Sequence, residues 1–419
     1  MQHAARRVCA GGMGMLLALT GCVPVGTDGD SLSDLVLGAS PTPAVDPTAN
    51  LEVEPNDSFD QAQPVYTGSP VELIGTLTPG ATAAELDIWE LGDVEAGDRV
   101  TGSVTVGATG DVVVGLLNEQ FELIGQVIAS NAIDHARTLD TIIPSAGERL
   151  YLTVGSRYGI AQPVDYNVVL TLHRDQPVAD ASRQAVVLNF SGGEGIRVAN
   201  RTGMNIPAFD AANIEARFAG QTETVIELLF ERVRQDFGSL GVDVYRDTDP
   251  AAPVDNVSTI HFGTYDAALL GLADNVDAFN ADTTQTAIVY TDTFALFTNL
   301  RPTESEIAQA LANVTSHEIG HLLGLRHTAN PNDVMDVTAT ASELLEDQWF
   351  GTAYLHTSVF PIGVQNSVQL LAWTVGGWVE PQVVQSPKTV AKQAARAVAD
   401  FTIPRAELVR CFCDKCEKH

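Results

Sequence analysis

The 419-residue sequence predicts a multidomain protein, in which an all-β sandwich is followed by an α+β domain with a twisted sheet and an active-site helix. Three observations predict this fold. Short apolar runs separated by turn residues fill residues 51–173 at the spacing of sandwich strands. Residues 185–380 instead alternate strand-like runs with long amphipathic patterns. Within them, residues 317–327 read H-E-x-x-H-x-x-G-x-x-H, which places two histidines on one face of a helix.

The composition is that of a globular and strongly acidic protein. Hydrophobic residues make up 45% of the chain and charged residues 18%, and the formal net charge is −30. The acidic residues are spread along the chain, which predicts a solvated surface and argues against nucleic acid as a partner. No stretch beyond the N-terminus reaches the length of a membrane-spanning helix.

The first residues have the features of a targeting segment. Two arginines precede a short apolar run over 8–19, and the sequence Leu-Thr-Gly-Cys then ends at Cys22. This sequence resembles the lipobox of bacterial lipoproteins, in which the cysteine is diacylated after cleavage. The resemblance implies a signal peptide over 1–21, a lipid anchor on Cys22, and an extracytoplasmic, membrane-anchored location in the bacterial cell envelope. The alternative is an ordinary secretory signal, which would give a secreted protein.

Three segments are expected to connect or extend the folded domains. Residues 22–50 are rich in Pro, Gly, Ser, Thr and Asp, which predicts a flexible tether that spans on the order of 30 Å. Residues 174–184 form a polar linker. Residues 381–419 form a C-terminal tail, in which zinc binding competes with the disordered or disulfide-bonded state that an oxidising location favours. The candidate ligands in the tail are Cys411, Cys413, Cys416 and His419.

Residues 51–173 resemble a known class of β-sandwich. The run Glu-Pro-Asn-Asp from Glu54, the run Asp-Ile-Trp up to Trp89, and the later Tyr151 and Tyr166 are similar to the bacterial pre-peptidase C-terminal domain. That family forms small β-sandwiches attached to secreted proteases. Here the region precedes the expected catalytic domain, whereas in the family it usually follows. The expected strands include 71–74, 100–104, 112–117, 151–154 and 167–170.

A group of oxygen-bearing side chains precedes the first long strand. Glu52, Glu54, Asn56 and Asp57 fall within six residues, and Asp87 could approach them from a neighbouring strand. Calcium takes roughly six to eight oxygen ligands, and this many acids would repel one another without a cation. The pattern E-x-E-x-N-D also resembles the calcium-binding segment of collagen-binding domains. A calcium site and a solvated acidic linker end are both compatible with these residues.

The second region contains the helix that carries the motif. Residues 303–306 read Thr-Glu-Ser-Glu, a capping box, and apolar residues then recur at helical spacing. Another long helix is expected near 222–238. The expected strands are 185–190, 242–245, 258–262 and 286–290, and a last helix is expected within 341–355.

The motif supplies the parts of a catalytic zinc site. On a helix, His317 and His321 can bind one ion together, while Gly324 can take the left-handed conformation that ends the helix and delivers His327 as third ligand. A catalytic zinc takes three protein ligands and leaves a position for water. Glu318 follows the first ligand, where its carboxylate can reach that water as a general base. We therefore predict a zinc hydrolase.

A turn-rich run after the third histidine leads to Met335, and this arrangement resembles the Met-turn of the metzincin metallopeptidases. The resemblance covers roughly residues 185–378, and it implies that Met335 is an apolar floor beneath the metal. It also implies a zinc endopeptidase of extracellular proteins, with a protein or peptide substrate extended along a strand, for which 286–290 is the candidate. Some metzincins add a tyrosine ligand two residues past the methionine. Val337 stands there in this chain, so a site of three histidines is expected.

Two other functions are compatible with the residues. The chain could be a surface-anchored binding lipoprotein whose β domain binds matrix or glycan, with zinc only structural, although such a site needs no base like Glu318. It could also be a zinc hydrolase of a non-peptide amide. Among the remaining histidines, His261 lies in a strand pattern and is expected to be structural. His135, His173 and His356 have no ligand-like spacing.

Overall fold

The computed structural model describes residues 49–65, 69–79, 85–107, 111–130, 136–156, 160–178 and 180–377. These residues all belong to one compact unit of the chain, Pro47–His419. Cys22, most of the expected tether and the C-terminal cysteines lie outside the described residues, so the expectations about them stay predictions. Within the described ranges, no helix combines the length and apolar character that a membrane span requires.

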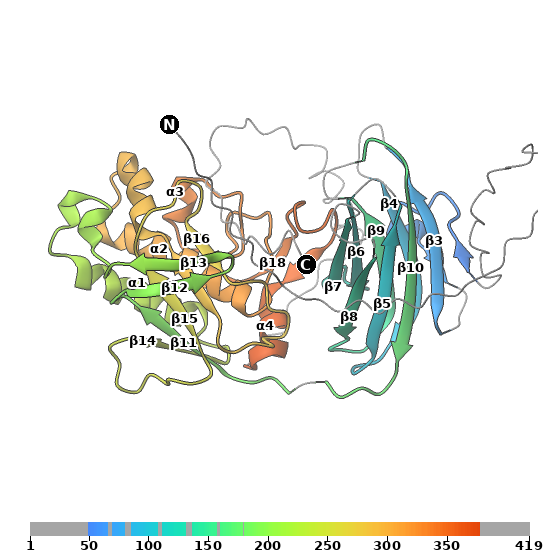
Figure 1. Cartoon of the computed structure of the whole chain (residues 1–419), viewed down its shortest axis with the longest axis horizontal. Helices are drawn as coiled ribbons and strands as arrows, with labels where there is room; N and C mark the ends of the chain where they lie inside the picture. Colours follow the sequence, from blue (N-terminus) through green and yellow to red (C-terminus); the bar gives the residue numbers. More distant parts are fainter. Residues whose placement is uncertain are drawn as a thin grey trace, which may run out of the picture. The chain divides into compact units, whose positions relative to one another are not determined.

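The described residues from 49 to 173 form two five-stranded sheets (Figure 1). The long strands pair antiparallel, and one two-residue strand joins each sheet in parallel. A short 3-10 helix, η1 (Phe59–Gln61), lies in the sequence between the two-residue strands of the two sheets. The first sheet has the order β1 (Asn50–Leu51), β3 (Val71–Leu77), β10 (Val164–His173), β5 (Arg99–Val106) and β8 (Ala136–Ile142). The second has the order β2 (Gln63–Pro64), β4 (Leu86–Val94), β9 (Gly147–Gly155), β6 (Asp111–Asn118) and β7 (Leu123–Ser130).

These two sheets share one apolar core, as a sandwich requires. Alternate residues of β10, among them Tyr166 and Val168, are buried, while their neighbours are more exposed. Trp89 of β4 lies in the same core, and its indole nitrogen donates a hydrogen bond to the Tyr166 hydroxyl at 3.1 Å. Because Trp89 and Tyr166 belong to different sheets, this contact joins the two layers. The expected all-β region is therefore a two-layer structure.

Residues 180–377 contain a third five-stranded sheet, with helices packed on it (Figure 1). Four strands are parallel and the fifth, β16, is antiparallel to its neighbour β17. The helices α1 (Thr222–Asp236) and α2 (Glu304–Leu322) pack against each other and contribute to one core with the sheet. The order of strands is β14 (Val242–Arg246), β11 (Gln184–Asn189), β15 (Val257–Phe262), β17 (Thr286–Val289) and β16 (Gly271–Ala273).

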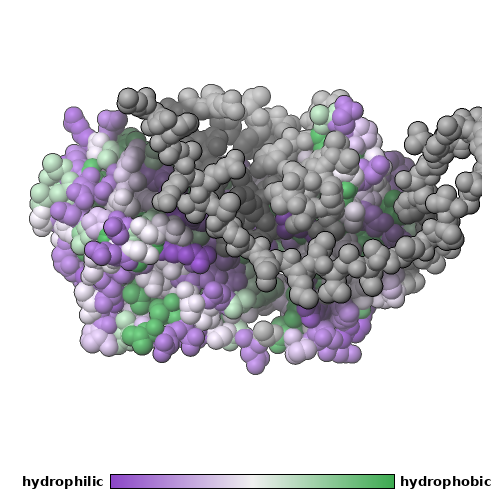
Figure 2. All heavy atoms as spheres, viewed as in Figure 1, coloured by the Kyte–Doolittle hydropathy of each residue, from purple (hydrophilic) through white to green (hydrophobic). Residues whose placement is uncertain are grey.

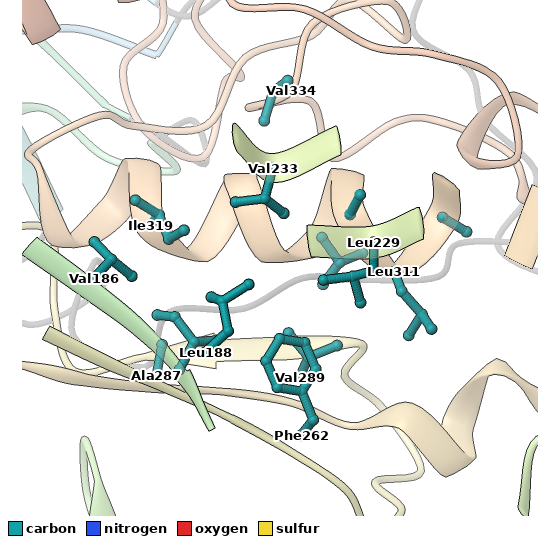
Figure 3. Close-up of a cluster of buried hydrophobic side chains, with 14 of the residues drawn as sticks. Val186, Leu188, Leu229, Val233, Phe262, Ala287, Val289, Leu311, Ile319 and Val334 are labelled. Atoms are coloured by element: carbon teal, nitrogen blue, oxygen red, sulfur yellow. The ribbon is translucent and has the colours of Figure 1, made fainter. Parts of the chain in front are cut away.

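Figure 3 shows the core between these helices and the sheet. Leu229 of α1 and Leu311 of α2 project toward apolar strand residues, among them Leu188 and Val289. The opposite face of the sheet is covered by the hairpin of β12 (Gly193–Val198) and β13 (Arg201–Ile206), since Tyr290 and other residues of that face cluster with hairpin residues. The sheet is thus buried on both faces, as parallel strands usually are.

Shorter elements complete the second region. They are three 3-10 helices, two short α-helices and a two-stranded hairpin that follows the motif. Their bounds are η2 (Ala211–Asn213), η3 (Ala216–Phe218), η4 (Thr291–Leu300), α3 (Ala341–Leu344), β18 (Thr352–Tyr354), β19 (Val364–Asn366) and α4 (Ser367–Val375). On the described part of the surface in Figure 2, hydrophilic residues are frequent, as the net charge of −30 leads one to expect.

One expectation about the sheet is wrong. The strand at 286–290 was the candidate for binding an extended substrate, but β17 pairs with β15 on one side and with β16 on the other. Its backbone groups are therefore already used within the sheet. The end strand on that side is β16, a three-residue strand whose length is too short to give a periodic signal in the sequence.

Candidate metal centre

Helix α2 places the first two histidines of the motif. Its start is the expected capping box, because Thr303 Oγ1 accepts a hydrogen bond from the Glu306 amide at 3.2 Å and the Glu306 carboxylate accepts one from the Thr303 amide at 2.6 Å. From there the helix runs through His317 and His321, which lie one turn apart and are both buried. The spacing read from the sequence is therefore realised on a regular helix.

Gly324 turns the chain back after the helix, as expected. Its φ of +95° lies in the left-handed region, and a Cβ there would lie 2.9 Å from the Asp277 carbonyl oxygen. The Leu325 amide then donates to the Gly320 carbonyl at 2.8 Å. This reversal brings His327 beside the two helix histidines.

The three histidines point ring nitrogens at one another. One nitrogen from each of His317, His321 and His327 lies within 4.8 Å of the others, and the Nε2 atoms of His321 and His327 are 3.0 Å apart. Carbonyl oxygens face the Nδ1 atoms, with Val334 O at 2.7 Å from His317 and Leu325 O at 2.8 Å from His321. A carbonyl can only accept, so these Nδ1 atoms carry the protons and the Nε2 lone pairs point into the cluster. This donor set fits a zinc ion.

Burial also keeps these imidazoles neutral. It lowers the pKa of His317 to about 4, and burial together with the nearby His317 lowers the pKa of His321 to about 3. Burial, followed by the proximity of His321, places the pKa of His327 well below its ordinary value. Neutral imidazole is the form that binds a metal, so the cluster is in its binding form at neutral pH. His317 Nε2 has no hydrogen-bond partner among the described residues, which agrees with a role as ligand.

Glu318 lies at the junction of α2 and the end strand β16. Its side chain is 1% exposed, and its Oε1 atom lies so close to Gly271 that a Cβ on Gly271 would collide with it. The carboxyl group is thus held against the sheet edge, on the residue that follows His317 in the helix. Nothing in the sequence spacing pointed to Gly271, which is 47 residues earlier in the chain (318 − 271).

Met335 packs beneath the same helix. It is fully buried, and a Cβ on Gly320 would lie 2.5 Å from its sulfur atom. The turn before it is organised by the buried Asp333, whose carboxylate accepts hydrogen bonds from the Met335 amide at 2.8 Å, the Thr328 hydroxyl at 3.2 Å and the Gly351 amide at 3.1 Å. Burial raises the pKa of Asp333 to about 6. The role of Met335 as a floor beneath the metal stays a prediction, whereas the contribution of Asp333 was missed.

Two residues later in the chain contact the segment of the third histidine. The His356 amide donates to the His327 carbonyl at 3.0 Å, and the Gln365 side chain is hydrogen-bonded to the backbone of Arg326. Arg326 and Gln365 are 39 residues apart, so their pairing has no local sequence signal. His261 is buried within β15, in agreement with the structural role expected for it.

The segment that contains this site is similar to a known protein family. Residues 211–348 match the family model described as Peptidase_M10, Matrixin. This segment resembles the matrixins, a metzincin family. The match contains the helix and all three histidines, spans about a third of the chain, and confirms the resemblance expected from the motif. It supports a zinc metallopeptidase acting on protein or peptide substrates.

Solved structures give further similarities at low identity. The chain is similar to an archaemetzincin from Methanopyrus kandleri, at 15% identity over 40% of this chain and 87% of that one, with a TM-score of 0.23. It is similar to a zinc-dependent peptidase from Methanocorpusculum labreanum at 13% identity, over 39% and 93%, with a TM-score of 0.24. A pre-peptidase C-terminal domain of a Bacillus anthracis collagenase matches at 14% identity, over 26% and 94%, with a TM-score of 0.20. No curated protein matches the chain.

The acidic group at the start of the β region is also brought together. Glu52, Glu54 and Asp87 offer oxygens within 4.8 Å of one another, and Glu54 forms a second such group with Asp57 and Glu85. Burial, followed by the charge of neighbouring carboxylates, raises the pKa of Asp87 to about 9. Glu85 was not among the residues expected from the sequence, although Asp87, two residues further along the chain, was.

Asn56 adjoins the acidic group, because its backbone amide donates to Glu54 Oε2 at 3.0 Å. Its side chain is fully buried, and neither its amide nitrogen nor its oxygen has a hydrogen-bond partner among the described residues. A buried amide without partners is costly, whereas a cation would use its oxygen. The group therefore fits a cation with oxygen ligands.

Proposed function

We propose that the chain is a zinc-dependent endopeptidase that hydrolyses peptide bonds of extracellular proteins. The observation that carries the proposal is the convergence of three buried imidazoles, with one ring nitrogen of each within 4.8 Å of the others. His317, His321 and His327 would hold the zinc ion. The match of residues 211–348 to the matrixins supports this assignment.

The remaining chemistry is assigned to residues of the chain. Zinc would supply Lewis acidity and an activated water. Glu318 takes the proton of the attacking water and returns it to the leaving amine, which a carboxylate beside the histidines can do. The carbonyls of Val334 and Leu325 hold the first two histidines in the required tautomer. Because Glu318 lies against Gly271 of β16, we expect the substrate chain on this side of the sheet.

The test compares the full-length protein with the variant Glu318→Gln. Glu318 is not a ligand, so the variant should keep its zinc content and its circular dichroism spectrum. Casein cleavage should fall by at least about a thousandfold, since the amide cannot accept the proton. A chelator should abolish cleavage by the unchanged protein. Cleavage that persists in the zinc-loaded variant would remove Glu318 from its assigned role.

We also propose that the acidic group of the β region binds calcium. Glu52, Glu54, Asn56, Asp57 and Asp87 are the residues expected from the sequence, and the buried, unpartnered Asn56 amide supports the assignment. Calcium binding would neutralise acids that otherwise repel one another.

Calcium should therefore raise the melting temperature of the full-length protein through mass action. The double variant Glu54→Gln with Asp57→Asn should lose this shift. The variant Glu194→Gln, at an exposed acidic position of β12, is the control and should keep it. Zinc-loaded samples titrated with calcium at pH 8 provide the measurement. An unchanged protein that melts equally in calcium and in a calcium-selective chelator would disprove the site.

A further inference from the structure

The segment that carries His327 is held by the β18–β19 hairpin. The Gln365 side chain, 2% exposed, accepts a hydrogen bond from the Arg326 amide at 2.7 Å and donates one to the Arg326 carbonyl at 2.8 Å. One residue on, the His327 carbonyl accepts from the His356 amide at 3.0 Å. The Ala329 amide then donates to the Tyr354 carbonyl at 2.9 Å. The backbone on both sides of the third histidine is therefore fixed by the hairpin.

The same hairpin is bonded to the two-sheet β region. The Val364 amide of β19 donates to the Phe121 carbonyl at 2.9 Å, and Val364 also bridges Glu122 in a parallel pairing. The Asn366 side chain donates to Glu122 Oε1 at 3.2 Å. Gln365, which holds Arg326, lies between these two anchored residues of β19.

Apolar packing joins the hairpin to the β region as well. Phe360, in the loop between β18 and β19, is fully buried in one cluster with residues of β4, β6, β7 and β9. Its ring lies on the backbone of β6 at Gly115, where a Cβ would lie 2.6 Å from the ring. Burying a phenylalanine side chain stabilises a contact more than one exposed hydrogen bond does. The apolar contact therefore dominates the attachment.

This attachment matters more for His327 than for the other two histidines. His317 and His321 are fixed by helix α2, whereas His327 follows the turn at Gly324 and has no helix or strand of its own. A ligand on an irregular segment depends on neighbouring elements for its position.

We propose that the two-sheet β region is a structural part of the metal centre, because it fixes the β18–β19 hairpin, which in turn positions the backbone around His327. The proposal rests on the proposed zinc site and goes beyond it. It assigns Phe360 and Gln365 as positioning residues and the β6 surface at Gly115 as the surface on which the hairpin packs. A β region of this kind is not a removable segment.

The experiment measures the rate at which full-length, zinc-loaded protein transfers zinc to a chromophoric chelator. Gly115→Val inserts a side chain where the Phe360 ring lies, and should speed zinc loss by about tenfold or more. Gly147→Val is the matched control in the same sheet, because a Cβ there meets only one atom, at 4.0 Å. Its rate should equal that of the unchanged protein.

A second set of variants tests the link if Gly115→Val does not fold. Phe360→Ala and Gln365→Leu should each speed zinc loss by about tenfold. The double variant should lose zinc no faster than the faster of the two single variants, because both changes break the same link. The conservative Phe360→Leu should restore the rate to within about threefold of the unchanged protein.

The outcomes separate the two proposals. An unchanged protein that binds no zinc would overturn the proposed endopeptidase. An unchanged protein that binds zinc, together with folded Phe360→Ala that loses zinc no faster, would overturn the structural role of the β region alone. Multiplicative effects of Phe360→Ala and Gln365→Leu would also overturn it, since independent contacts would give that result.

Discussion

Gly271 leaves the space that the carboxyl group of Glu318 occupies. Glycine has no Cβ, and the Glu318 Oε1 atom lies where the smallest side chain on Gly271 would begin. Any larger residue must displace the carboxyl group, because β16 is paired to β17 and α2 is packed on the sheet. The position of the proposed general base, Glu318, therefore depends on Gly271, a residue without a reactive side chain.

We expect Gly271→Ala to lower kcat for casein cleavage by at least about tenfold with zinc content unchanged, because the base moves while the histidines do not. Gly220→Ala is an informative contrast. It should reduce stability through its φ of +80° but leave kcat unaffected, since a Cβ there meets no atom within 4 Å. Kinetics at saturating substrate, with zinc measured on the same samples, would check this. Equal kcat for Gly271→Ala and the unchanged protein would refute the argument.

Among the secondary-structure elements, helices α1 and α2 are joined by a hydrogen bond to a titratable carboxyl group. The Ser316 hydroxyl, one residue before the first histidine, donates to Asp236 Oδ2 at 2.5 Å at the end of α1. Burial, followed by repulsion from Asp347, raises the pKa of Asp236 to about 7. A carboxyl whose pKa is raised on folding favours the folded state while it is protonated. Its ionisation therefore lowers the free energy of unfolding as the pH rises from about 4 to about 7.

Asp236→Asn should remove this pH-dependent decrease in the free energy of unfolding. The variant should gain at least about 1 kcal/mol of stability relative to the unchanged protein when the pH rises from 5 to 8. The asparagine oxygen can still accept the Ser316 hydrogen bond. Urea unfolding of zinc-loaded protein at both pH values is the measurement, and Asp255→Asn at an exposed position is the control. A variant that tracks the unchanged protein at both values would contradict the assignment.

For the whole molecule, we propose a location outside the cytoplasm, because the N-terminal sequence resembles a lipoprotein signal. Cys22→Ser should move the protein from the membrane fraction to the soluble fraction of a bacterial host, since the acyl chains supply the anchor. Cys411→Ser is the control and should leave the protein with the membranes. Fractionation with detection by antibody gives the answer. Membrane association of Cys22→Ser would indicate a different anchor.

Features that depend on neighbours along the chain can be predicted from the amino-acid sequence. The helix through His317 and His321, its capping box at Thr303 and the turn at Gly324 were predicted, because spacing of three to four residues sets the faces and ends of a helix. Five strands of the β region were predicted for a similar reason, since short apolar runs between turn residues are a local signal.

The distant residues that complete these local features could not be predicted and are known from the folded structure. It placed β16 beyond β17, Gly271 against Glu318, and Gln365 beside Arg326. It also added Glu85 to the acidic group. Such contacts depend on strand order and on the packing of segments far apart in the chain. Many pairings of distant segments satisfy the same local patterns, and the shared burial of apolar side chains selects one of them.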